Sequence, residues 1–149
     1  MTDIVLYIHI LAATVWVGGS IFLFFLGIFL RDKEAQKQVY LHIGPLYGYL
    51  ESVWLVILIT TGLHLFYSYS LDAILAAQTP KDLAYYLMVK IVLVVLITVA
   101  TIVHMYIAFK THGKERTKLQ LFLSRSSSMA IFFLNLLILW YAIQIRSLL

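Results

Sequence analysis

The stretch LAYYLMVKIVLVVLITVATIVHMYIAF, residues 83–109, decides the fold class of this chain. It holds one charged residue, Lys90, and it is longer than the roughly 20 residues that an apolar helix needs to cross a bilayer core. Three further runs have the same character, at residues 4–30, 45–70 and 127–147. With 62% hydrophobic and 12% charged residues and a mean hydropathy of +0.94, the chain holds more apolar surface than a soluble domain of 149 residues can bury. The sequence therefore predicts an all-α integral membrane protein, built as an antiparallel up-down four-helix bundle in a single domain, residues 1–149.

Local signals place the ends of these helices. Pro45 is expected to open the second helix, after a short charged connector at residues 31–41. Thr79 is a candidate N-cap for the third helix, and residues 124–128 are expected to lead into the fourth. The first run lacks a basic leader and a small-residue cleavage site, so we expect a retained helix rather than a signal peptide.

Basic residues are unevenly distributed between the connections, and this predicts the orientation in the membrane. The first and third connections are rich in them, whereas the second has only Lys81 and the C-terminal tail only Arg146. The rich connections carry Arg31, Lys33, Lys37, Lys110, Lys114, Arg116, Lys118 and Arg125. Because positive charge marks the cytoplasmic side, both chain ends are predicted to lie outside. The net charge of +4 is then a topology signal, with membrane lipids rather than nucleic acid as the expected partner.

The polar residues within the apolar runs are the candidate functional residues. At a rise of about 1.5 Å per residue, His9, His64 and Lys90 fall at a similar depth in the outer half of three different helices. His9 shares a helix face with Trp16, and Lys90 shares one with His104. Ionisable groups inside membrane helices usually face the bundle interior.

Two imidazoles at one depth on facing helices suit the iron of a six-coordinate b-type haem, and helix bundles build cofactor sites from such facing side chains. His9 and His64 are therefore the candidate axial ligands, and Trp16 is expected to pack in the bundle or against the bound group. Apolar room on one side is expected from Ala12, Ala13, Gly18 and Gly19. The alternative is that the two histidines only form hydrogen bonds between helices, each worth about 0.6–2 kcal/mol. The chain has no cysteine, so a thiolate metal site and a covalently attached haem are not expected.

The remaining polar residues leave alternatives open. Lys90 either extends its ammonium group to the outer interface or pairs with an anion such as a haem propionate or a substrate carboxylate. His104 either ligates a second, inner haem together with His42 or forms a salt bridge with Glu51. The sequence also leaves homo-oligomerisation open.

Two segments resemble a known membrane family. HILAATVWVGG, residues 9–19, resembles the first helix of the HemJ-type protoporphyrinogen oxidases and the CopD-like copper-resistance proteins, and MVKIVLVVLITVATIVHMYIAFK, residues 88–110, resembles their third helix. The HemJ resemblance implies a b-type haem held by His9, an important lysine at Lys90, and an oxidoreductase that oxidises protoporphyrinogen IX in electron transport with the respiratory chain. The CopD resemblance implies copper handling. Both imply a bacterial inner (cytoplasmic) membrane.

The second helix departs from the HemJ pattern, because TTGLHLF at residues 60–66 contains a histidine and the proline lies far from the TTG step. Two main functions therefore stay open. One is a haem b redox protein that acts on a tetrapyrrole or exchanges electrons with quinones. The other is a copper transporter or sensor with His9, His64 and Met88 as metal ligands. A role as a small structural subunit is a third possibility.

Overall fold

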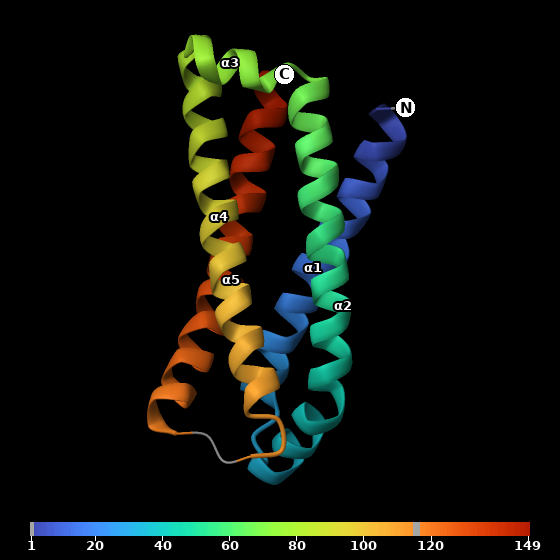
Figure 1. Cartoon of the computed structure of the whole chain (residues 1–149), viewed down its shortest axis with the longest axis vertical. Helices are drawn as coiled ribbons and strands as arrows, with labels where there is room; N and C mark the ends of the chain where they lie inside the picture. Colours follow the sequence, from blue (N-terminus) through green and yellow to red (C-terminus); the bar gives the residue numbers. More distant parts are fainter. Residues whose placement is uncertain (1, 115–116) are drawn as a thin grey trace.

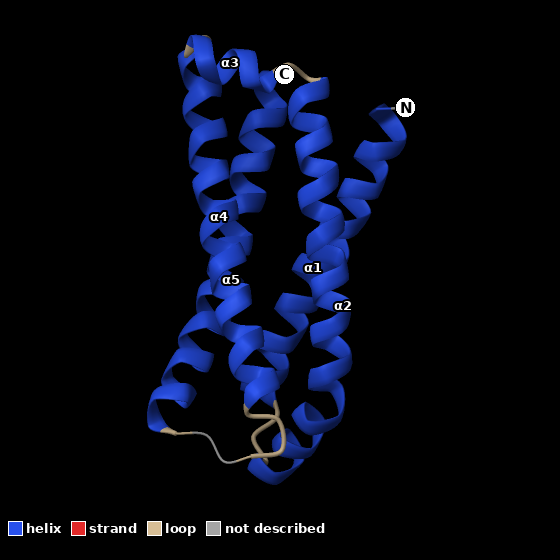
Figure 2. Cartoon of the chain, in the orientation of Figure 1, coloured by secondary structure: helices blue, strands red, loops and turns tan. Residues whose placement is uncertain are grey.

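The computed structural model describes residues 2–114 and 117–149. This part of the chain forms five helices: α1 (Thr2–Phe29), α2 (Lys33–Ser68), α3 (Leu71–Ala77), α4 (Lys81–Lys110) and α5 (Lys118–Leu148). No strand occurs among the described residues, and Figure 2 shows helices joined by short loops. All except α3 are long and apolar enough to cross a membrane. The all-α class and the four long apolar helices are therefore confirmed.

The long helices pack mainly as two pairs, α1 with α2 and α4 with α5. Figure 1 shows both chain ends and α3 at one end of the molecule, and the α1–α2 and α4–α5 connections at the other. The pairs meet where Phe24 of α1 stacks on Phe132 of α5, with ring centroids 3.9 Å apart. They also meet where the Ser52 hydroxyl of α2 donates a hydrogen bond to the Met105 sulfur of α4. The interior of the bundle therefore lies between the two pairs.

The distribution of polar and apolar side chains suits lipid surroundings. Large apolar residues such as Phe22, Val95 and Trp140 are more than half exposed. The buried residues include several polar ones, namely Ser20, Glu51, Thr101, Ser124, Ser127 and Asn135. Small and polar side chains at helix contacts, with apolar residues outside, are typical of helices that pack within a bilayer.

Helix α2 begins earlier than the sequence predicts. It starts at Lys33, and Pro45 lies inside it instead of opening it. The Asp32 side chain accepts hydrogen bonds from the backbone N–H groups of Glu34 and Ala35, at 2.9 and 3.3 Å. This N-cap starts the helix, so the predicted connector at residues 31–41 is mostly the first part of α2.

Helix α5 also begins earlier than predicted, because a capping box lies upstream of the serine-rich segment. The Gln120 backbone N–H donates to Thr117 Oγ1, and the Thr117 backbone N–H donates to Gln120 Oε1. Residues 124–128 therefore lie within the helix rather than before it. This places Ser124 and Ser127 against α4, where both are buried.

The short helix α3 closes the end of the molecule that holds the chain ends. Leu71 from α3 packs in one buried apolar cluster with Leu83 and Leu87 of α4 and Ile145 of α5. The following helix starts differently from the prediction. Its N-cap is Pro80, whereas the Thr79 hydroxyl donates to the Ala77 carbonyl oxygen at 3.2 Å.

Candidate functional site

His9 is held by a neighbouring helix. Its side chain is half-buried on α1, and its Nδ1 lies 2.8 Å from the hydroxyl oxygen of Thr61 on α2. The close approach depends on Gly62, because a Cβ atom at this position would come within 3.2 Å of His9 Cε1. The TTG step of the sequence therefore supplies both a hydrogen-bond partner and space for the imidazole ring.

The hydrogen bonds around Thr61 favour one tautomer of His9. The single hydroxyl proton of Thr61 is directed to the backbone carbonyl oxygen of Ile57, at 2.6 Å. Thr61 Oγ1 therefore acts as the acceptor for an N–H on His9 Nδ1. In the neutral ring this leaves a lone pair on Nε2, which is the usual form of an imidazole that ligates a metal through Nε2.

His64 lies on α2 within one helical turn of Thr61, but its side chain is exposed. Other residues of α2 that share its helix face agree with this position, because Val53 is 56% exposed and Thr60 is also exposed. The structure therefore does not turn His64 toward the interior of the bundle, in contrast to His9. The expected pair of opposed imidazoles is not formed in this arrangement.

Lys90 lies on the interior face of α4. The same face carries Ile97 and Thr101, which are 3% and 1% exposed. Lys90 itself is half-buried, and it makes no hydrogen bond or ion pair with any residue that the structure describes. It lies close enough to His9 for the two groups to interact electrostatically. A cation without a counter-ion therefore lies near the candidate ligand.

Trp16 joins α1 to α5 in the interior. Its indole N–H donates to Asn135 Oδ1 at 3.0 Å, and both side chains are buried. The other end of the Asn135 amide, Nδ2, is buried without an acceptor among the described residues. An unpaired buried donor of this kind indicates a group, such as water or a bound molecule, that completes the hydrogen bonding.

We expect Trp16→Phe to destabilise the bundle by about 1–2 kcal/mol, because it leaves the Asn135 carbonyl oxygen without its donor. Thermal unfolding of the detergent-solubilised protein measures this effect. Trp140→Phe is the matched control, since Trp140 is 59% exposed. Equal melting temperatures for the two variants would show that the Trp16–Asn135 bond contributes little.

Gly19, predicted to provide room for a cofactor, instead provides room for a neighbouring helix. A Cβ at this position would lie 2.5 Å from the hydroxyl oxygen of Tyr47 on α2. The space beside Gly19 is therefore filled by the Tyr47 ring in this structure. Gly18, in contrast, has no atom within 4 Å of the position of such a Cβ.

The two inner histidines have different surroundings. His104 is half-buried on α4, and its Nδ1 lies 3.2 Å from both the Ser124 carbonyl oxygen and Ser127 Oγ of α5. His42 is exposed on α2, and its Nδ1 lies 2.8 Å from the Gln38 carbonyl oxygen of the same helix. The structure therefore directs His104 toward α5 and leaves His42 on the surface.

Two further residues contribute to the interior, and their sequence signals are weak. Thr61 orients His9, and its only signal was its place in the TTG step. Glu51 is 8% exposed and makes no hydrogen bond or ion pair within the described part of the chain. A carboxyl group inside a membrane helix is a functional candidate in its own right.

The residues around His9 can be tested against the needs of a b-type haem. The haem needs a neutral imidazole with an available nitrogen, apolar surroundings, and partners for its carboxylates. His9 Nε2 and Lys90 fit the first and last of these needs, whereas His64 does not face the same interior. Within residues 2–114 and 117–149, no three side chains of His, Cys, Asp or Glu gather to hold a metal ion. Among these residues, His9 is therefore the one candidate protein ligand for haem iron.

Comparisons of the chain with protein-family models, with curated proteins and with solved structures give no significant match.

Proposed function

We propose that this chain is a membrane-embedded redox protein that binds b-type haem, with His9 as an axial ligand. The observation that carries the proposal is the His9–Thr61 hydrogen bond of 2.8 Å, which orients the ring and leaves Nε2 for the iron. A second axial bond from His64 requires this side chain to leave its exposed position. The proposal therefore rests on His9.

The role proposed for Lys90 is to bind a carboxylate. Its ammonium group lies near His9 and has no counter-ion among the described residues. A haem propionate or the carboxylate of a tetrapyrrole substrate would supply the anion and gain a charge-assisted hydrogen bond. The Asn135 amide offers a further buried donor in the interior.

The reaction proposed is electron transfer, and the haem would supply the one-electron chemistry of its iron. The HemJ resemblance of residues 9–19 and 88–110 suggests oxidation of protoporphyrinogen IX, and electron exchange with the quinone pool is the alternative reaction. In either case the protein residues hold the cofactor, exclude water and bind the carboxylates.

We further propose that the two basic connections face the cytoplasm of a bacterial inner membrane. Both chain ends lie at the end of the molecule opposite these connections (Figure 1). Alkaline phosphatase fused after Leu149 is therefore expected to be active, and a green fluorescent protein fused there to be dark, because both ends lie outside. The reverse pattern would contradict this orientation.

The test of the proposed function is the visible spectrum of the detergent-purified protein, oxidised and reduced, together with its iron and copper content. We expect a Soret band, a sharp α-band on reduction, and iron that is extracted as non-covalent haem. Colourless protein that retains copper would instead support the copper-handling alternative. Colourless protein without either metal, even after incubation with haemin, would overturn the proposal.

A further inference from the structure

A groove of about 320 Å³ lies between α4 and α5, near the end of the bundle that carries the two connections. Its walls are mainly apolar, and Ile107, which is 6% exposed, contributes to them. The lining residues are Ile102, Val103, Tyr106, Ile107, Lys110, Gln120 and Leu123. From Ile102 to Lys110 the groove follows α4 for roughly 12 Å, which suits part of an extended hydrocarbon chain.

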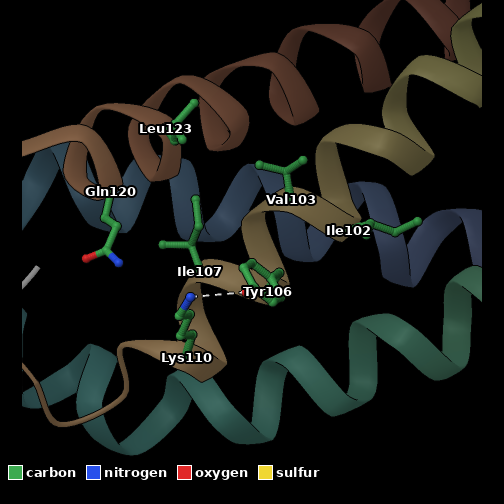
Figure 3. A pocket seen from close by; sticks show the side chains of 7 residues that line it. All are labelled: Ile102, Val103, Tyr106, Ile107, Lys110, Gln120 and Leu123. Atoms are coloured by element: carbon green, nitrogen blue, oxygen red, sulfur yellow. Dashed lines mark hydrogen bonds between the residues drawn. The ribbon is translucent and has the colours of Figure 1, made fainter. Parts of the chain in front are cut away.

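One end of the groove is polar and positively charged. Figure 3 shows Lys110 and Gln120 toward this end, and Ile102 at the other. The Lys110 ammonium group donates to the Tyr106 hydroxyl at 3.1 Å and lies 5.2 Å from the centre of the Tyr106 ring. Tyr106 therefore holds the charge beside the mouth of the groove. The Gln120 side chain reaches the same end, and its Oε1 accepts from the Thr117 N–H.

Basic residues in the described part of the chain also lie near this end of the groove. Lys114, Lys118 and Arg125 are exposed on the connection and on the first turns of α5. No ion pair of Lys110 with a carboxylate is present in the described part of the chain. A ligand that is apolar along most of its length and anionic at one end complements this arrangement. Basic pockets between membrane helices at the cytoplasmic side bind anionic lipid headgroups in this way.

We infer that this groove is a binding site for an anionic phospholipid. One acyl chain lies along Ile102, Val103 and Leu123, and the headgroup phosphate is bound by the Lys110 ammonium group. The site is separate from His9 and Lys90 and does not depend on a bound cofactor.

The test is competition between dioleoyl phosphatidylglycerol and dioleoyl phosphatidylcholine, which share acyl chains and differ in net charge. Equal amounts are added to the full-length purified protein in detergent, and bound lipid is counted by native mass spectrometry. We expect the wild type to retain the anionic lipid about fivefold over the zwitterionic one, because both lipids carry the phosphate but only the zwitterionic headgroup adds a cation near Lys110, and one basic residue contributes about 1 kcal/mol toward a net negative headgroup. Lys110→Gln should bring this ratio close to one. Val103→Trp should lower the retention of both lipids, because the new ring fills the groove.

Lys33→Gln is the matched control, since Lys33 is an exposed lysine at the start of α2, outside the groove. It should retain the wild-type ratio, and circular dichroism should show that all variants remain helical. Equal retention of the two lipids by the wild type would overturn the site. The same holds if Lys33→Gln lowers the ratio as much as Lys110→Gln, or if Val103→Trp retains both lipids as well as the wild type does.

Discussion

His9→Ala is expected to lower the haem content of the purified protein by at least about tenfold. Removing a residue that only supports a metal ligand already lowers metal affinity by about 10–100-fold, and this substitution removes the ligand itself. The physical reason is that the substitution removes the imidazole that the Thr61 hydroxyl orients. The fold should persist, because His9 is half-buried and its hydrogen bond contributes about 0.6–2 kcal/mol. Haem content per protein, measured as the pyridine haemochrome, gives the result.

Two further variants make this prediction specific. His112→Ala is the control, because His112 is exposed in the α4–α5 connection, and its haem content should equal that of the wild type. Thr61→Val retains the ligand but removes the acceptor of its N–H, so we expect a smaller loss of haem than in His9→Ala, together with a changed reduction potential. If His9→Ala keeps the haem content and reduced spectrum of the wild type, His9 is not a ligand.

Lys90→Met is expected to weaken the retention of haem or the turnover of a tetrapyrrole by about 10–100-fold, which corresponds to the loss of a hydrogen bond to a charged group. The melting temperature should not fall. A lysine at the centre of a membrane helix costs about 2.5–3.5 kcal/mol, and less toward the interface, so its removal relieves this cost. Haem content, activity with protoporphyrinogen and the melting temperature are measured together.

The controls for Lys90 separate charge from shape and position. Lys90→Arg should retain part of the function, because the charge remains in a different geometry. Lys81→Met makes the same change at an exposed position at the start of the same helix, and it should leave haem content and activity unchanged. If Lys90→Met behaves like Lys81→Met, the ammonium group of Lys90 only reaches the outer interface, and no anion binds there.

Hydropathy was sufficient to predict the four long helices, because each apolar run exceeds the length that a bilayer requires. It could not place the helix ends, which depend on local hydrogen bonds. Asp32 caps α2 upstream of Pro45, and Thr117 with Gln120 caps α5 upstream of Ser124. Both signals are visible in the sequence, but proline and the serine-rich segment were taken as stronger boundaries.

The candidate site was predictable in part. Residue spacing places Trp16 on the same helix face as His9, and Trp16 is buried in the structure. The depth of a residue along a helix, however, does not determine the direction in which its side chain points around the helix axis. For this reason His64 was assigned to the interior although the neighbouring Thr61 is the residue that contacts His9. A contact of this kind depends on the packing of two helices, which the pattern of a single helix does not contain.

Chemical rescue of His9→Gly with imidazole tests the central claim most directly, because it separates the ligand from the rest of the side chain. The variant is purified without haem, incubated with haemin, and its reduced spectrum is recorded with and without added imidazole, beside His112→Gly and the wild type. We predict that His9→Gly lacks the sharp reduced α-band, that imidazole restores it, and that His112→Gly needs no imidazole. A wild-type spectrum from His9→Gly in the absence of imidazole would contradict the assignment of His9 as the ligand of a membrane-embedded haem.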